Sequence, residues 1–184
     1  QKLVLQEYEN AGIYRNQVDT GAVIITGETS RKENARRVLE AISEYAGKFV
    51  VATAGPHLES VLAAKGAGAA DYSEKTGRTV LHMDIGGGTS NLSFIENGRI
   101  TATGCLNVGG RLVKFAPTGE ITYISPVLDG LCDLRLGEIP TQTQLSEITE
   151  ILVQALEMAA GLREPTTLLE QLSTREAESA WKPP

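Results

Sequence analysis

Three consecutive glycines interrupt two apolar runs in the segment LHMDIGGGTSNLSFIENGRI, residues 81–100. Each glycine costs roughly 0.5–1 kcal/mol more backbone entropy than alanine, so a run of three requires a local reason. A hairpin turn that needs positive φ is usually satisfied by one or two glycines. The run from Gly86 to Gly88 therefore indicates that something approaches the bare backbone, with a glycine-rich hairpin turn as the alternative.

The residues around the triplet predict an antiparallel meander. Residues 79–84 form an apolar strand pattern, and residues 91–96 alternate between the two faces of a strand. Asn97-Gly98 is a strong hairpin signal, and residues 99–106 supply the returning strand. The triplet is thus expected in the turn between the first two strands, with Asp84 at the end of the first.

The part of the chain before the meander predicts an α/β arrangement. Residues 22–26 and 49–53 are short apolar runs that we expect to be strands, and helical patterns follow them at 31–47 and 57–71. Strands that alternate with helices favour a parallel pair. The polar segment 71–78 is the predicted domain boundary, which divides the chain into residues 1–75 and 76–184.

After the meander the pattern is less regular. We expect a helix over residues 111–116, a strand over 121–125 and a long amphipathic helix over 143–160. The two cysteines, Cys105 and Cys132, lie far apart and without a metal-binding spacing, so they are expected to be buried thiols rather than a disulfide or a zinc site.

The charge and hydropathy of the chain exclude several partners. A net charge of −6 and a pI near 5.0 argue against nucleic acid and against an anionic membrane surface as partners. The sequence contains no run of 18 apolar residues, so no membrane span and a cytoplasmic location are expected. Because the chain begins at Gln1, we expect it to be a piece of a longer protein.

The triplet differs from two familiar phosphate-binding motifs. A dinucleotide fingerprint should open a helix, whereas a strand follows here, and a P-loop requires a Gly-Lys-Ser/Thr sequence that the chain lacks. Successive N–H groups without Cβ atoms can instead surround phosphate oxygens, with the Thr89 hydroxyl as a further donor. Asp84 is placed to orient a magnesium-bound water. Together these groups predict a nucleotide site.

The segment D-I-G-G-G-T between a strand and a hairpin, followed by a second Gly-Gly, resembles the second phosphate motif of the actin, hexokinase and DnaK-type ATPase superfamily. Longer strings across most of residues 18–112 resemble the reactivating factors of ethanolamine ammonia-lyase. The resemblance implies a partial ribonuclease-H-like, actin-type α/β fold that holds the end of the first lobe and the start of the second. It also implies ATP and Mg²⁺ as cofactors.

The same resemblance implies roles for individual residues. Asp84 would be the catalytic carboxylate that holds the metal through water. The expected nucleotide-binding residues are Gly86, Gly87, Gly88 and Thr89 at the β- and γ-phosphates, and Gly109 and Gly110 at the neighbouring edge of the pocket.

The sequence departs from this pattern at the start of the second helix. DnaK-type relatives carry a glutamate before the proline, whereas this chain has Gly55 before Pro56, so hydrolysis is expected to be slow or to use another group. Glu59 is expected to be an ordinary solvated residue, and His57 a packing or capping residue at the helix start.

The implied function is an ATP-dependent chaperone that releases damaged cobalamin from adenosylcobalamin-dependent ethanolamine ammonia-lyase. Its expected partners are that lyase and ATP, and association with a bacterial microcompartment is an open alternative to a purely cytoplasmic location. Two other functions stay open: a kinase-like phosphotransferase of the same superfamily, and a non-catalytic scaffold with a vestigial nucleotide cradle.

Overall fold

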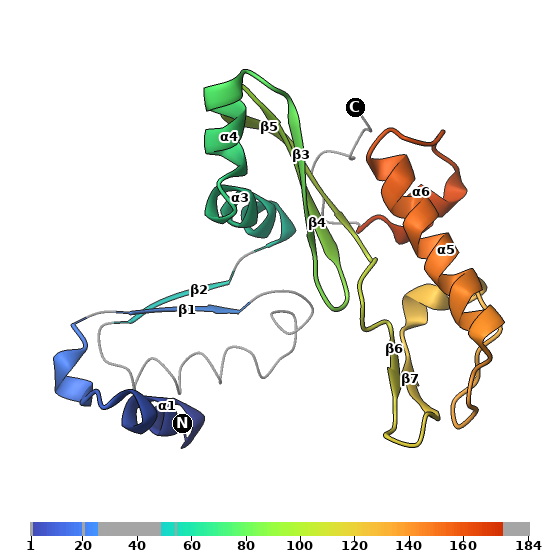
Figure 1. Cartoon of the computed structure of the whole chain (residues 1–184), viewed down its shortest axis with the longest axis horizontal. Helices are drawn as coiled ribbons and strands as arrows, with labels where there is room; N and C mark the ends of the chain where they lie inside the picture. The colour runs from blue at the N-terminus through green and yellow to red at the C-terminus, as the bar shows by residue number, and fades with distance from the viewer. Residues whose placement is uncertain (1, 20, 26–48, 54, 175–184) are drawn as a thin grey trace. The chain divides into compact units, whose positions relative to one another are not determined.

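The computed structural model of the chain describes residues 2–19, 21–25, 49–53 and 55–174 (Figure 1). The chain separates into two compact units, Gln1–Gly55 and Pro56–Pro184. The boundary predicted near residue 75 concerns the lobes of a larger fold and stays a prediction. The α/β class itself is confirmed by the order of helices and strands.

The first unit contains the predicted parallel strand pair. It begins with helix α1 (Lys2–Ala11) and the short helix η1 (Arg15–Gln17). Strands β1 (Gly21–Ile25) and β2 (Phe49–Thr53) then pair in parallel along their whole length. Both strand predictions are confirmed. The helix expected over 31–47 lies outside the described residues.

The second unit is built on the predicted meander. Strands β3 (Val80–Ile85), β4 (Ser90–Glu96) and β5 (Arg99–Leu106) form an antiparallel sheet in the order β3-β4-β5. Asn97 and Gly98 both have positive φ, 49° and 77°, as a two-residue hairpin turn between β4 and β5 requires. The predicted strands and their antiparallel order are confirmed.

Helices α3 (Pro56–Gly66) and α4 (Ala69–Thr76) cover one face of this sheet (Figure 1). Ile95 is fully buried in an apolar cluster with Ala64 and Ala70. The small side chains of both helices allow this close approach. A hydrogen bond also joins α3 to the sheet, since Ser93 Oγ donates to the carbonyl of Ser60 at 2.9 Å.

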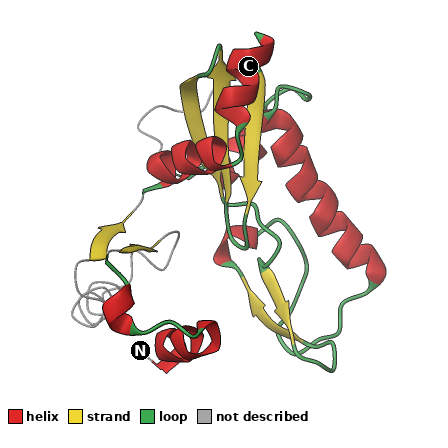
Figure 2. Ribbon diagram, turned by 60° about the vertical axis from the view of Figure 1, so that its left-hand side comes forward, coloured by secondary structure: helices red, strands yellow, loops and turns green. Residues whose placement is uncertain are grey.

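The opposite face of the sheet packs on the C-terminal helices α5 (Gln142–Ala159) and α6 (Thr167–Leu172), as Figure 2 shows. Leu92 and Leu106 are fully buried there. A capping box between Thr141 and Gln144 fixes the start of α5, so the predicted long helix is confirmed. Because helices cover both faces, β4 is buried on both sides instead of alternating.

The helix predicted over residues 111–116 is wrong. Residues Val113–Phe115 form strand β6, which pairs in antiparallel fashion with β7 (Ile121–Ile124). The residue before Pro117 is disfavoured in helical conformation, and Gly119, at φ 99°, lets the chain turn back. The short helix η3 (Pro126–Leu128) follows β7.

The two cysteines are free thiols. Cys105 is buried as expected, whereas Cys132 is only half-buried. Within the described ranges, none of the helices combines the length and the apolar character that crossing a bilayer requires.

Candidate nucleotide-binding site

The glycine triplet lies in the turn that joins β3 to β4. Ile85 and Ser90 form the last pair of the two strands, and the amide of Gly86 donates to the carbonyl of Thr89 at 2.9 Å to close the turn. None of the three glycines has φ in the left-handed region. The interpretation of the triplet as a turn that needs positive φ is therefore wrong. Close approach accounts for Gly87, whereas a Cβ atom at Gly88 would lie in open space.

One close approach comes from the second glycine pair. The amide of Gly110 donates to the carbonyl of Gly86 at 3.0 Å, and the amide of Arg111 donates to the carbonyl of Gly87 at 2.7 Å. A Cβ atom added at Gly109 would lie 2.5 Å from the carbonyl carbon of Gly87, closer than real side chains come. The fold thus brings together the two glycine segments predicted to form one site.

A second close approach comes from the side chain of Arg111. A Cβ atom added at Gly87 would lie 2.5 Å from Arg111 Nε and 2.7 Å from its Nη2. The guanidinium therefore covers the bare backbone of the turn. Sequence reasoning missed Arg111, although its position directly after Gly109-Gly110 was a signal that could have been used.

The turn suits an anion. Across the described ranges, the amide N–H groups of Gly87 and Gly88 donate no hydrogen bond within the chain. Free amides on a backbone without Cβ atoms, beside a guanidinium, match the oxygen atoms of a phosphate group. Thr89, which is half-buried, ends the same turn. The residues present therefore fit a nucleotide phosphate.

Asp84 stands beside the turn, where the sequence predicted it. It is exposed, lies next to the end of β3, and pairs directly with Asn91 of β4. Directly opposed residues of antiparallel strands place their side chains on the same face, with Cβ atoms about 5 Å apart. A carboxylate and an amide are oxygen donors of the kind that Mg²⁺ accepts. Within the described residues, no three His, Cys, Asp or Glu side chains gather as metal ligands.

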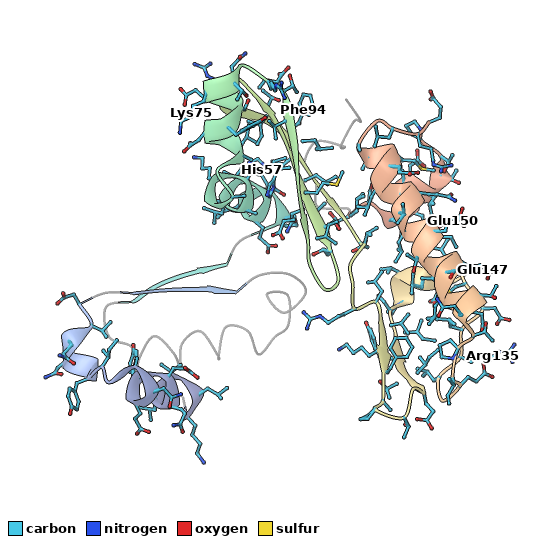
Figure 3. All side chains as sticks on the ribbon, in the orientation of Figure 1. His57, Lys75, Phe94, Arg135, Glu147 and Glu150 are labelled. Carbon is cyan, nitrogen blue, oxygen red and sulfur yellow. The ribbon has the colours of Figure 1, made fainter. Side chains whose placement is uncertain are left out.

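Helix α3 brings two further polar side chains to this face of the sheet. His57 projects from α3, as Figure 3 shows. Its Nδ1 lies 2.6 Å from the hydroxyl of Thr103, a contact that agrees with the predicted packing role. Glu59 is not the ordinary solvated residue that we expected, because its Oε2 accepts a hydrogen bond of 3.1 Å from Asn91 Nδ2. Sequence reasoning missed Asn91, since nothing in the linear pattern indicates its partner 32 residues away.

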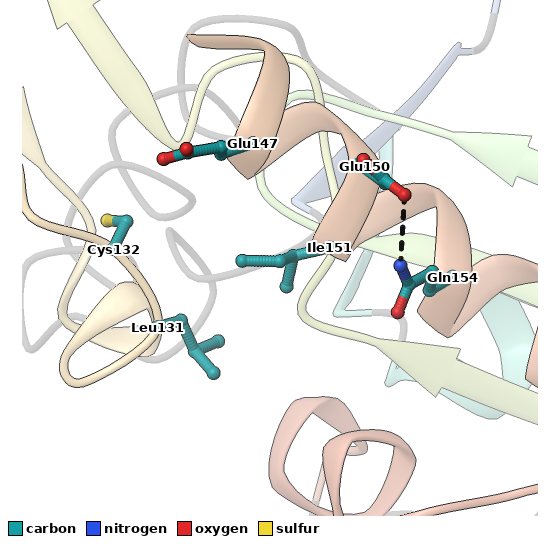
Figure 4. Close-up of a pocket in the computed structure, with 6 residues that line it drawn as sticks. All are labelled: Leu131, Cys132, Glu147, Glu150, Ile151 and Gln154. Atoms are coloured by element: carbon teal, nitrogen blue, oxygen red, sulfur yellow. Dashed lines mark hydrogen bonds between the residues drawn. The ribbon is translucent and has the colours of Figure 1, made fainter. Parts of the chain in front are cut away.

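A separate pocket of about 380 Å³ opens between α5 and the segment after η3, lined by Leu131, Cys132, Glu147, Glu150, Ile151 and Gln154 (Figure 4). Desolvation by burial is the largest effect on the Cys132 thiol and raises its pKa. A backbone hydrogen bond from Leu134 lowers this pKa in part, and the nearby carboxylates of Asp129 and Asp133 raise it. The thiol is therefore protonated at neutral pH and is a poor nucleophile. None of the six residues that line this pocket is among the site residues predicted from the sequence.

The fold and the turn define an α/β protein with a glycine hairpin suited to phosphate. The chain belongs to the family of ethanolamine utilisation protein EutA, which matches residues 1–182. It is 51% identical over 121 residues to the ethanolamine ammonia-lyase reactivase EutA of Salmonella typhimurium, and equally to that of Escherichia coli. The match covers 66% of this chain and 26% of each relative, so it spans about a quarter of their length.

Solved structures with partial likeness include the PPX-GPPA enzyme of Aquifex aeolicus, with 20% identity and a TM-score of 0.46. That match covers 89% of this chain and 46% of the enzyme. MreB5 of Spiroplasma citri bound to ADP has 21% identity and a TM-score of 0.35, and covers 59% of this chain and 30% of MreB5. Likeness at this level says nothing about ligands or activity.

Proposed function

We propose that this chain is the phosphate-binding part of an ATP-dependent chaperone that reactivates ethanolamine ammonia-lyase. The observation that carries the proposal is the match of nearly the whole chain to the EutA family, with curated relatives named as reactivases of that lyase. Reactivation would consist of releasing damaged cobalamin from the lyase. The protein would act in the cytoplasm or in a bacterial microcompartment that holds the lyase.

The glycine turn supports ATP as the ligand. The Gly86–Thr89 turn would hold the β- and γ-phosphates through its amides and the Thr89 hydroxyl, and Gly109 and Gly110 would form the adjoining edge of the pocket. The docking of Gly109 on Gly87 supports this assignment, because the two segments form one continuous backbone surface. The side chain that lies over Gly87 there is the cationic Arg111, whose charge would attract a phosphate.

Asp84 would hold Mg²⁺ through water. An exposed carboxylate beside an anion site would repel a phosphate if it acted alone, and a divalent cation between them removes that repulsion. When bound, Mg²⁺ would neutralise charge on the phosphate oxygens. Asp84 is therefore the proposed catalytic residue, since it would position the metal-bound waters around the phosphates.

Nucleotide would act by shifting the balance between conformations. A ligand changes a conformational equilibrium only when it binds one state more tightly than the other. ATP and ADP differ in the γ-phosphate that the turn is proposed to contact. Hydrolysis would thus change the affinity of the protein for the lyase and allow the cobalamin to leave.

The test uses the complete protein that contains this chain, with inactivated ethanolamine ammonia-lyase, ATP, Mg²⁺ and fresh adenosylcobalamin. Recovery of lyase activity that requires ATP supports the proposal. Omission of ATP and a Gly87→Val variant are the controls. A phosphorylated small molecule without lyase recovery would favour the phosphotransferase, and neither product would favour the scaffold.

A further inference from the structure

The turn between β4 and β5 contains the one Asn-Gly pair of the sequence, Asn97-Gly98. Asn97 is exposed, and its side-chain amide has no hydrogen-bond partner among the described residues. Glycine has no Cβ atom to shield its backbone nitrogen, so this nitrogen reaches the side chain of a preceding asparagine more easily than the nitrogen of any other residue does. The pair is therefore chemically suited to deamidation.

Deamidation requires only water in addition to these two residues. The backbone nitrogen of Gly98 forms a bond to the side-chain carbonyl carbon of Asn97, and the side-chain nitrogen leaves as ammonia with the proton that the Gly98 amide gives up. Water then opens the resulting succinimide ring at either carbonyl, which leaves aspartate or isoaspartate at position 97. Ring closure thus needs a Gly98 amide that is free to lose its proton and to turn toward the side chain of Asn97.

The structure ties that amide to helix α4. The N–H of Gly98 donates to Ser73 Oγ at 3.2 Å, and the Ser73 hydroxyl donates in turn to the carbonyl of Arg78 at 2.7 Å. Ser73 is fully buried. A hydrogen bond to a buried acceptor shields the N–H from hydroxide and must break before the nitrogen can attack. The attacking group is therefore held by Ser73 in the folded protein.

Contacts with α4 also hold the backbone of the turn. Asn97 and Gly98 have φ of 49° and 77°, the left-handed values that a tight two-residue hairpin turn needs. A Cβ atom added at Gly98 would lie 2.9 Å from Glu74 Cβ and 3.5 Å from the carbonyl oxygen of Ala70, so the turn lies directly against the helix. The Gly98 nitrogen can turn toward the Asn97 side chain only after the turn has separated from α4.

We propose that Asn97 is a latent deamidation site and that Ser73 keeps it closed while the turn is docked on α4. Local opening of the turn would release the Gly98 amide and allow the reaction. The product adds a carboxylate beside Glu74 and Glu96, and repulsion between these like charges would oppose renewed docking. Isoaspartate would also lengthen the backbone by one carbon atom and disrupt the turn. None of these residues belongs to the proposed nucleotide site.

The test compares Ser73→Ala with Ser60→Ala in the complete protein that contains this chain. Ser60 is the matched control, because it is also a fully buried helix serine, but its hydroxyl donates to the carbonyls of Pro56 and Gly104. The folded proteins are incubated at mildly alkaline pH, and mass spectrometry measures aspartate and isoaspartate at position 97. We expect about fivefold faster deamidation in Ser73→Ala than in the parent, the factor that a net hydrogen bond of about 1 kcal/mol gives. Ser60→Ala should match the parent.

Two further measurements do not depend on how well Ser73→Ala folds. Deamidation of Asn97 in the parent should be at least about tenfold slower when folded than in urea, which an opening free energy of about 1.4 kcal/mol would give. Hydrogen exchange at the Gly98 amide of the folded parent should be slowed, since its N–H is bonded to a buried oxygen.

Three results would overturn the inference. Equal deamidation rates in the folded and the urea-unfolded parent would show that the docked turn gives Asn97 no protection. A parental rate in a folded Ser73→Ala variant would remove Ser73 from this role. Equal acceleration in Ser73→Ala and Ser60→Ala would assign the effect to a general loss of stability rather than to the bond between Ser73 and Gly98.

Discussion

The guanidinium of Arg111 lies against Gly87, in the space that a side chain at position 87 would occupy. The amide of the same arginine donates to the carbonyl of Gly87 at 2.7 Å, so the backbone holds the side chain at the turn. A positive charge thus stands beside two amides that are free for an anion. This relationship makes Arg111 a testable contact for phosphate.

Arg111→Met should weaken binding of ATP and ADP by the complete protein. A hydrogen bond to a charged group contributes roughly 1.5–3 kcal/mol when buried, and because Arg111 is exposed we expect about 1.4 kcal/mol, or tenfold in Kd. Lys114→Met, a neighbouring exposed cation that lies over the ring of Tyr123, is the control and should leave Kd unchanged. Calorimetry at two salt concentrations measures both. Equal Kd values in the parent and Arg111→Met would remove Arg111 from the site.

Gly109→Ala should destabilise the second unit. The added Cβ would lie 2.5–2.6 Å from backbone atoms of Gly87 and Gly88, which cannot move without breaking the turn, and overpacking of this kind costs about 1–3 kcal/mol. Gly110→Ala is the matched control, because nothing lies within 4 Å of its Cβ and its φ is not left-handed. Urea unfolding of both variants compares their stability. The prediction fails if the two alanines cost the same.

Gly87→Val should abolish nucleotide binding with little loss of stability. The valine would displace the flexible end of Arg111 rather than backbone, so the fold can accommodate it. The branched side chain would, however, cover the amides proposed to contact phosphate and push away the guanidinium. Calorimetry with ATP and thermal unfolding check the two halves of the expectation. ATP affinity at the parental level would exclude the turn as the phosphate site.

Asp84→Asn should reduce the dependence of ATP binding and hydrolysis on Mg²⁺. The two side chains are nearly the same size, so the strand and the turn should persist. If Asp84 holds the metal, the variant loses most of the increase in ATP affinity that Mg²⁺ gives the parent. If Asp84 only stabilises the turn, Tm falls and the magnesium effect stays. ATP titrations with and without Mg²⁺, on both proteins, decide between these outcomes.

Cys132 should react slowly with alkylating agents near neutral pH. Desolvation raises the pKa of this thiol, so at a given pH less thiolate is present than in a free cysteine, and thiolate is the reactive form. The rate should rise at higher pH than it does for a small free thiol. Iodoacetamide labelling across a pH series, followed by mass spectrometry of the Cys132 peptide, measures this shift. Labelling that matches a free thiol at every pH would contradict it.

Local sequence pattern determined the elements around the site. The alternation in residues 91–96, the Asn97-Gly98 turn and the apolar run before Asp84 each act over a few residues, and they correctly predicted β3, β4 and β5. The same local reasoning failed at residues 111–116, where the apolar positions suit either a helix or a strand and Pro117 with Gly119 favour the hairpin. The placement of Asp84 beside a glycine turn followed from sequence alone.

Tertiary structure decided why the glycines are there and which side chains join them. Gly109 meets Gly87, and Asn91 meets Glu59, only because β3, β4 and α3 pack in one arrangement. Gly87 and Gly109 are 22 residues apart in the sequence, and Glu59 and Asn91 are 32 residues apart. The local sequence pattern specifies how side chains repeat along a helix or strand, but not which element packs beside it. The sequence by itself therefore determined the strands, the turn and the position of Asp84. Packing alone determined the contacts of the turn, the bond from Asn91 to Glu59, and the position of Arg111 over Gly87.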